Sequence, residues 1–370
     1  YTLSLHDALP IFQVIRNLLR MSVYQIKYMD AVPDSAVCNE AVKLAKRHKF
    51  AQLSGFVNGV LRNIARNIDS VQFDTLSIRY SMPQWIVDRF VAAYGEKKAE
   101  EIFKAFHNKS TISIRTNLTR CTPDELRATL EAEGVTVTAV DELNYAFVIS
   151  GFDYLNGLQS FRDGLFYVQD ISSMLVAQTA APKKGDYVID VCAAPGGKST
   201  HIAELLQGSG HVLARDLTDN KVDMIEENIE RHGLNNMSAE VWDATVFDAD
   251  SAGKADILIC DLPCSGLGVL GRKKDIRYKM TPESVDELTA LQRQILDTVH
   301  TYVKPNGVLV YSTCTIDEAE NEDNVRWFIE KHPEFELDKS FAEGTGMKQI
   351  LPGEHGSDGF FIARFIKSKL

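Results

Sequence analysis

Long apolar runs are absent from this 370-residue sequence. No segment approaches the roughly 20 apolar residues that a membrane-spanning helix needs, which excludes a transmembrane protein. Cysteine is also scarce, because the six cysteines are scattered and form no C-x-x-C pair. This excludes a disulfide-stapled scaffold and leaves no zinc-ligand pattern. We therefore expect a reduced, cytoplasmic protein with no metal and no membrane partner.

An excess of positive charge is missing as well. The 40 Lys and Arg against 51 Asp and Glu give a net charge of -11, which by itself disfavours a polyanionic partner. The charge is uneven, however: residues 1–75 carry a net +3, residues 76–164 a net -2 and residues 165–370 a net -12. The excess of acidic residues therefore lies mainly in the C-terminal half. The net charge does not exclude contacts between local basic residues and nucleic acid.

The hydrophobic pattern of the sequence changes twice along the chain, and the length is that of two or three structural units. Apolar residues recur at helical spacing within residues 13–75, which predicts a small all-α unit. Residues 76–164 combine helical segments with alternating strands and a capping box from Thr122 to Glu125, which predicts a small α+β unit. Residues 165–370 form the third expected unit.

The first twelve residues differ in character from the rest of the sequence. The sequence begins with Tyr1 rather than Met, and YTLSLHDALPIF looks like translated adapter sequence. We expect residues 1–12 to be non-native; a native helix start or loop is the alternative. The genomic sequence upstream of Gln13 would distinguish the two.

Strands and helices alternate throughout residues 165–370, which predicts a parallel, doubly wound α/β sheet. The expected strands are 187–191, 211–216, 238–244, 255–261 and 307–314, and the expected helices are 199–206, 217–233, 284–302 and 318–332.

The segment DVCAAPGGKST (190–200) connects the first expected strand to the first expected helix. Such a turn lies at the carboxyl edge of the sheet, where ligands bind. Gly197-Lys198-Ser199 fits the end of a phosphate-binding loop, but Cys192 occupies the position of its first glycine. A nucleoside cofactor held by its ribose is the better match, because Asp216 stands at the end of the second strand.

Acidic residues follow further strands of the same sheet. Asp243 comes after the third strand and could accept a hydrogen bond from an adenine amino group. Such acids suit a cofactor with hydroxyls and an amine, and S-adenosylmethionine is favoured over a nucleoside triphosphate. The structural alternative is that Asp216 and Asp243 each cap the helix that follows.

Two cysteines also stand at strand ends, Cys264 in DLPCSG and Cys314 in YSTCT. A lone cysteine is usually a small core residue, as we expect for Cys38, Cys121 and Cys260. Two cysteines facing a cofactor site suggest a thiolate nucleophile. Methylation of carbon 5 of a pyrimidine needs such a nucleophile, because carbon 5 becomes reactive only after addition at carbon 6.

DVCAAPGGKST, DLPCSG and YSTCT, in this order and spacing, resemble motifs of the RNA 5-methylcytosine methyltransferases. FVNGVLRNIAR, RYSMPQWIVDRF and DGFFIARF narrow the resemblance to enzymes of that family that act on small-subunit (16S) ribosomal RNA. The resemblance covers about residues 13–368. It implies a Rossmann-like S-adenosylmethionine-dependent methyltransferase sheet (165–370), preceded by a shortened all-α NusB-like RNA-binding unit (13–75) and a small α+β unit (76–164).

The resemblance also implies roles for particular residues. Cys314 would be the nucleophile and Cys264 would assist product release, whereas DNA cytosine methyltransferases use the cysteine at the Cys264 position as nucleophile. Asp261 would offset charge on the ring and lie near the methionine end of the donor. Lys198 would steady the base or lower a thiol pKa, with a solvated helix-start lysine as the alternative. The residues expected to bind S-adenosylmethionine are Cys192, Ala193, Ala194, Pro195, Gly196, Gly197, Lys198, Asp216, Asp243 and Asp261.

RNA binding must come from local positive charge. The segment LGRKKDIRYK (270–279) follows the Cys264 loop and is expected to contact phosphates, and Lys43 to Lys49 form a second basic cluster. The expected function is methylation of a cytosine in 16S rRNA by a monomeric enzyme. The alternatives are the same chemistry on tRNA or another rRNA site, and a non-catalytic RNA-binding or assembly protein.

Overall fold

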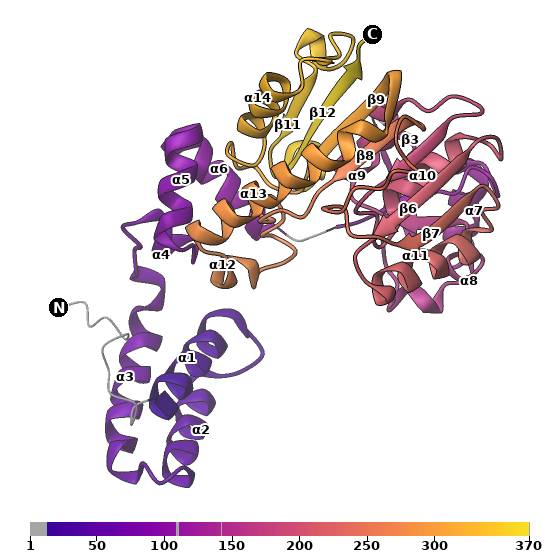
Figure 1. Cartoon of the computed structure of the whole chain (residues 1–370). Helices are drawn as coiled ribbons and strands as arrows, with labels where there is room; N and C mark the ends of the chain where they lie inside the picture. Colours follow the sequence, from indigo (N-terminus) through magenta and orange to yellow (C-terminus); the bar gives the residue numbers. More distant parts are fainter. Residues whose placement is uncertain (1–12, 109–110, 142, 370) are drawn as a thin grey trace. The chain divides into compact units, whose positions relative to one another are not determined.

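The computed structural model describes residues 13–108, 111–141 and 143–369 (Figure 1). The chain divides into two compact units, the first ending at Thr75 and the second beginning at Leu76, and each is described by itself. Residues 1–12, which the sequence sets apart, lie outside the described residues. None of the described helices combines the length and the apolar character needed to cross a membrane.

The first unit is helical, as predicted. It consists of α1 (Gln13–Tyr28), α2 (Asp34–Arg47) and α3 (Ser54–Asn67). Apolar residues three and four positions apart form its core, which includes Ile15, Leu18, Ala41, Ala45, Val57 and Leu61. The helix α2 begins directly after Pro33, whose fixed φ suits that position, and no side chain caps it.

The second unit contains a small antiparallel sheet in the order β2-β3-β1-β4. Its strands are β1 (Ile112–Thr116), β2 (Thr136–Val140), β3 (Leu143–Ser150) and β4 (Phe166–Val168), and its helices are α7 (Pro123–Ala132) and α8 (Gln159–Arg162). The predicted capping box is present, because Thr122 and Glu125 exchange hydrogen bonds at the start of α7. The strand β4 continues the small sheet beyond residue 164.

A larger sheet in the order β10-β12-β9-β8-β5-β6-β7 forms the rest of the second unit, with β11 paired to β12. The strands β5 (Tyr187–Asp190), β6 (His211–Asp216), β7 (Met237–Val241), β8 (Ala255–Asp261) and β9 (Val303–Thr313) run parallel. Antiparallel strands complete one side: β10 (Phe335–Leu337), β11 (Met347–Ile350) and β12 (Phe360–Lys367).

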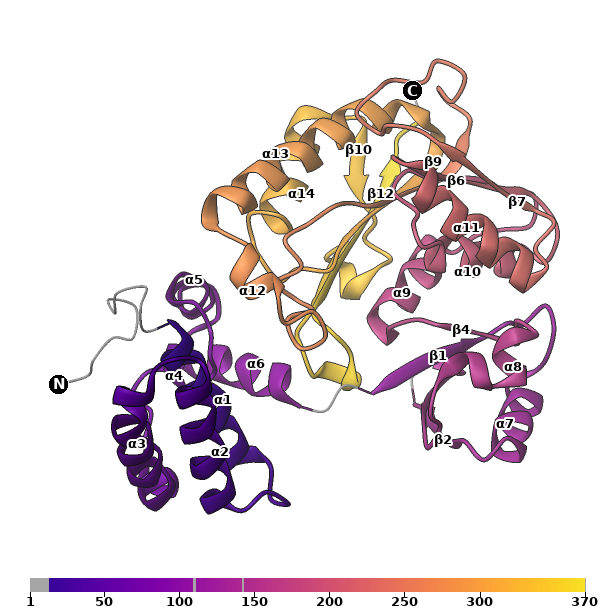
Figure 2. The same cartoon turned by 90° about the horizontal axis from the view of Figure 1, so that it is seen from below.

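Helices cover both faces of this sheet (Figure 2). One face packs against α13 (Pro282–Val299) and α14 (Glu322–Lys331). The other packs against α9 (Ile171–Ala180), α10 (Gly197–Leu205) and α11 (Asp219–His232). The predicted doubly wound α/β class is confirmed. The antiparallel strands were not predicted, because the segments that form them carry no alternation with helices.

A helical cluster packs beside the loop that follows β8. It comprises α4 (Leu76–Arg79), α5 (Gln84–Tyr94), α6 (Glu96–His107) and α12 (Ile276–Lys279). The helices α5 and α6 share a buried core with Leu267, Leu270 and Ile316. This packing fixes the two loops that carry Cys264 and Cys314.

Candidate active site

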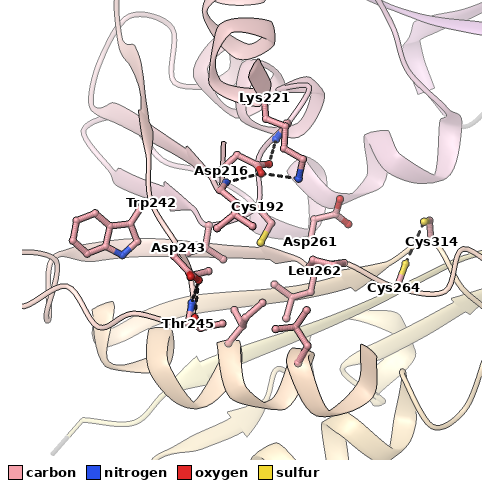
Figure 3. A pocket seen from close by; sticks show the side chains of 17 residues that line it. Cys192, Asp216, Lys221, Trp242, Asp243, Thr245, Asp261, Leu262, Cys264 and Cys314 are labelled. Atoms are coloured by element: carbon pink, nitrogen blue, oxygen red, sulfur yellow. Dashed lines mark hydrogen bonds and ion pairs between the residues drawn. The ribbon is translucent and has the colours of Figure 1, made fainter. Parts of the chain in front are cut away.

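A cavity of about 280 Å³ opens at the carboxyl edge of the parallel strands (Figure 3). Cys264 and Cys314 lie at one end of it, and Trp242 and Asp243 lie at the other. Leu262, Pro263, Leu291 and Ile295 supply an apolar wall, the last two from α13. A site with one apolar wall and several acids suits a ligand that is part aromatic and part polar.

The turn between β5 and α10 is held from several sides. The hydroxyl of Ser199 donates to the buried Asp190 carboxylate, and Asn228 donates to the Pro195 carbonyl at 2.9 Å. Arg115, fully buried on β1, donates to the Gly197 carbonyl at 2.9 Å and pairs with Glu204 at 2.9 Å. The turn is therefore a rigid wall of the cavity, positioned partly by the small sheet.

Asp190 lies beneath this turn rather than in the cavity. Burial raises its pKa to about 7, and the nearby Asp261 charge acts in the same direction, against the Ser199 hydrogen bond. The Oδ1 atom of Asp190 has no hydrogen-bond partner among the described residues.

Asp216 ends β6 with its side chain almost fully buried. Its Oδ2 accepts from the Ala194 amide at 2.9 Å, and its Oδ1 accepts from the Leu217 amide and from Lys221 Nζ, each at 2.8 Å. The helix α11 starts at Asp219 with Thr218 as its N-cap, so Asp216 does not cap it. The carboxylate is fixed at the cavity wall instead.

Asp243 is exposed at the far end of the cavity. Its Oδ1 accepts from the Thr245 hydroxyl at 2.7 Å and from the Thr245 amide at 2.8 Å, and these bonds lower the pKa of Asp243. The backbone that follows forms a turn rather than a helix. The helix-cap alternative therefore fails for Asp243 too.

Asp261 ends β8 and faces the middle of the cavity. Lys198 Nζ contacts its Oδ2 at 2.6 Å, and the Ser312 hydroxyl donates to its Oδ1 at 2.7 Å. Burial acts to lower the pKa of Lys198, but the Asp261 charge outweighs it and the pKa is raised. Lys198 is thus a buried cation paired with Asp261, not a solvated helix-start lysine.

The sulfur atoms of Cys264 and Cys314 are 3.2 Å apart. The hydrogen bond between them lowers the pKa of Cys314 and raises that of Cys264, and the charge of Lys198 also favours the Cys314 thiolate. Cys314 is therefore the more readily ionised thiol of the pair.

The cavity gathers many of the residues that the sequence singled out. Cys192, Ala194, Asp216, Asp243, Asp261, Cys264 and Cys314 line it. Ala193, Pro195, Gly196, Gly197 and Lys198 belong to the turn behind its wall or touch its residues. Sequence reasoning missed Lys221, Trp242, Leu291, Ile295, Ser312 and Arg115. Ser312 stands within the YSTCT motif, whereas no local signal marks Arg115, which lies about 80 residues before the turn it holds.

Several basic residues of the segment after Cys264 (270–279) are held by other protein groups, so fewer of them than expected can contact RNA phosphates. Arg277 is buried and donates to the Ser81 and Leu270 carbonyls, and Arg272 pairs with Asp170 and Asp358. Lys279 pairs with Asp275. Lys273 and Lys274 are exposed and make no ion pair within the described part of the chain. The prediction of phosphate contacts is thus wrong for Arg277 and narrows to these two lysines.

Family models and curated relatives match most of the chain. A family model described as 16S rRNA methyltransferase RsmB/F matches residues 177–366, a NusB family model matches residues 6–66, and a ferredoxin-like domain model of RsmF/B-like methyltransferases matches residues 82–152. The chain is 38% identical to the probable ribosomal RNA small subunit methyltransferase B of Bacillus subtilis, over 95% of this chain and 82% of that protein. It is 31% identical to ribosomal RNA small subunit methyltransferase B of Shewanella oneidensis, over 96% of this chain and 83% of that protein.

Solved structures are also similar to most of the chain. The crystal structure of PH0851 superposes with a TM-score of 0.79 at 28% identity, over 96% of this chain and 82% of that one. NSun6 from Pyrococcus horikoshii with SFG superposes with a TM-score of 0.71 at 25% identity, over 78% of this chain and 99% of that one. The chain belongs to the RsmB/F family of 16S rRNA methyltransferases.

Proposed function

We propose that this rRNA methyltransferase transfers a methyl group from S-adenosylmethionine to carbon 5 of a cytosine in 16S rRNA through a covalent bond from Cys314 to carbon 6. The observation that carries the proposal is the Cys264–Cys314 pair, with its sulfur atoms 3.2 Å apart beside Asp261 and Lys198. Methylation at an exocyclic nitrogen or a ribose hydroxyl needs no thiolate, whereas carbon 5 does.

The donor set of the cavity fits S-adenosylmethionine. Asp216, fixed by the Ala194 and Leu217 amides, offers carboxylate oxygens for ribose hydroxyls, and Asp243 is placed for the adenine amino group. The wall of Leu262, Pro263, Leu291 and Ile295 suits the faces of adenine. When bound, this cofactor supplies a methyl group on a positively charged sulfur. SFG, an analogue of S-adenosylmethionine, appears with the similar NSun6 structure.

The first step assigned to the protein is nucleophilic addition. The Cys314 thiolate forms a bond to carbon 6, and the electrons of the 5,6 double bond move into the ring. Cys264 holds the thiolate in place before the attack by donating its S–H. The target base must be unpaired or flipped out of its stack to reach Cys314.

Asp261 and Lys198 act on the charge that develops in the ring. A hydrogen bond at N3 requires a proton on N3 or on Asp261, and Lys198, 2.6 Å from Asp261, is the donor that can supply it. Ser312 keeps the other carboxylate oxygen oriented. The pair thereby stabilises the state in which carbon 5 is nucleophilic.

Product release reverses the addition. After carbon 5 has gained the methyl group, a base removes its proton, the 5,6 double bond re-forms and the Cys314 sulfur leaves as a thiolate. The S–H of Cys264 stabilises that leaving thiolate, because the two atoms are already in contact. Loss of Cys264 should therefore slow the last step more than the first.

Cysteine variants test this proposal. Cys314→Ala is expected to abolish transfer of tritiated methyl groups to unmodified 16S rRNA. Cys264→Ala is expected to accumulate a covalent protein–RNA adduct, visible on a denaturing gel. Cys121→Ala, which alters a half-buried cysteine of the small sheet, is the matched control and should behave as the parent.

The outcomes separate the possibilities. Adduct accumulation in Cys314→Ala with loss of methyl transfer in Cys264→Ala would exchange the two roles. Full activity in Cys314→Ala would exclude the covalent route. Bisulfite sequencing of RNA from a strain lacking the protein identifies the substrate: loss of one 16S methylcytosine supports the proposal, and loss at a tRNA site favours the alternative substrate.

The division of labour along the chain is also part of the proposal. Residues 165–370 would hold the methyltransferase site and residues 76–164 a small connecting unit. Residues 13–75 would bind RNA, consistent with the NusB family match at residues 6–66.

A further inference from the structure

Two helix ends bring histidines and a carboxylate together on the side of the large sheet away from the active site. Asp297 lies near the end of α13, His300 follows α13, and His332 follows α14. The helices α13 and α14 pack side by side on one face of the sheet (Figure 2). One ligand atom from each of Asp297, His300 and His332 lies within 4.8 Å of the other two.

Local geometry explains why these groups meet. Asp297 and His300 are three residues apart, so they share one face of the helical turn. Arg293, one turn earlier on α13, donates to Asn324 of α14 at 2.8 Å and fixes the two helices against each other. The His300 and His332 rings consequently lie with centroids 3.9 Å apart.

His332 presents a buried ring nitrogen to this cluster. Its side chain is only 8% exposed, and its Nε2 atom makes no hydrogen bond among the described residues although it lies 3.2 Å from Asp297 Oδ1. A buried nitrogen without a hydrogen bond is costly unless it binds another group.

A further carboxylate faces the same rings. Glu334 Oε1 lies 3.9 Å from His332 Nδ1 and 3.7 Å from His300 Nε2. At these distances the Glu334 carboxylate makes no direct hydrogen bond to either ring, but its negative charge lies close to both. His300 and Glu334 also line an open cavity of about 510 Å³.

We propose that Asp297, His300 and His332 form a binding site for a divalent transition-metal ion, with zinc as the preferred ion. Two imidazoles and one carboxylate are a donor set that suits zinc, and water would complete a tetrahedron. The cluster lies at the amino end of β9, whereas Cys314 follows its carboxyl end. The pairing of β9 with β8, which runs from Ala255 to Asp261 of β8, places the two sites roughly 20 Å apart.

That separation assigns the ion a structural role. Coordination would join the end of α13 to the end of α14. Lys331 Nζ, 2.8 Å from Asp297 Oδ1, occupies part of the same coordination space and competes with the ion. Removal of this lysine should therefore strengthen metal binding, which a purely structural ion-pair cluster would not show.

Zinc uptake by the full chain tests the site. The paired thiols of Cys264 and Cys314, with their sulfur atoms 3.2 Å apart, could also bind zinc, so the parent for this experiment carries Cys264→Ser and Cys314→Ser. The chain is treated with EDTA, dialysed and titrated with zinc chloride, with bound zinc measured by elemental analysis and calorimetry. The parent is expected to bind one zinc ion per chain and to unfold at a higher temperature with zinc than without.

Substitutions locate the ion. Asp297→Asn and His332→Gln should each weaken zinc binding by about tenfold or more. Lys331→Met should tighten it. His48→Gln changes an exposed histidine of the first unit and should leave binding unchanged. If His332→Gln fails to fold, the half-exposed Asp297→Asn decides the question. The proposal would be overturned if the parent took up no zinc, or if Asp297→Asn and His332→Gln bound zinc as tightly as the parent.

Discussion

The buried carboxyl of Asp190, beneath the turn between β5 and α10, makes the stability of the fold depend on pH. Its pKa is raised to about 7, mainly by burial, from an ordinary value of 3.8. The folded state therefore holds a proton that the unfolded chain releases above pH 4. The resulting stabilisation is complete below pH 4 and is lost as the pH rises through 7.

Asp190→Asn should remove this pH dependence, because the amide keeps an acceptor for Ser199 and carries no charge. Relative to the parent, the variant should gain about 2 to 3 kcal/mol of stability between pH 5 and pH 8. Urea unfolding followed by tryptophan fluorescence measures this, since Trp85, Trp242 and Trp327 all lie in the second unit. The exposed Asp223→Asn is the control, and a constant difference between parent and Asp190→Asn across this range would refute the assignment.

Residue-level prediction from the sequence succeeded where strand ends determine position. Asp216, Asp261 and Cys314 reach one cavity because each ends or follows a parallel strand. It failed where a side chain acts across a long sequence separation. Arg115 of β1 holds the Gly197 carbonyl, and the burial of Arg277 depends on a helical cluster almost 200 residues earlier. Local patterns carry no information on such contacts.

At the scale of elements, Gly268 joins the two loops that carry the cysteines. Its amide donates to the Cys314 carbonyl at 3.1 Å, and its carbonyl accepts from the Gly359 amide at 2.9 Å. A Cβ at this position would lie 2.3 Å from the Gly359 oxygen and 2.8 Å from the Cys314 oxygen. Only glycine at position 268 lets the loop after β8 lie this close to the loop after β9 and to the loop before β12.

Gly268→Ala should therefore displace the Cys314 loop. We expect the variant to lose about 1 to 3 kcal/mol of stability and about 100-fold in methyl transfer, because small displacements of reacting groups have large effects on rate. Gly59→Ala is the control, since its site in α3 is open and helical. Parent-like activity of Gly268→Ala would show that the two loops adjust independently.

The element order was predictable in the parallel part of the sheet and less so elsewhere. The alternation of strand and helix from Tyr187 to Thr313 gave β5 to β9 in sequence order. The strands β10, β11 and β12 follow α14 without intervening helices, so their pairing with β9 depends on tertiary packing. The short β4, three residues long, is below the length at which alternation can be recognised.

At the scale of the whole molecule, the net charge of -11 opposes RNA binding, so attraction must come from a few uncompensated cations. In the second unit, many cations near Cys264 and Cys314 are already neutralised, as Arg272 is by Asp170 and Asp358. Lys273 and Lys274 are exposed and unpaired within the described residues, and the charge of Lys273 is felt by Cys314.

Lys273→Ala and Lys274→Ala should each weaken binding of 16S rRNA and reduce the slope of log affinity against log salt by roughly 0.7 to 1. The reason is that each phosphate contact releases counterions when it forms. Filter binding at several salt concentrations measures the slope, and methyl transfer at saturating RNA shows whether chemistry is spared.

Lys254→Ala is the matched control, because this exposed lysine precedes β8 at the opposite edge of the sheet and removes the same charge. It should change the slope much less than either loop variant. Equal effects from all three lysines would mean that RNA responds only to the total charge of the chain. A difference confined to Lys273 and Lys274 would place the RNA backbone beside the cysteine pair, where the proposed addition to the base occurs.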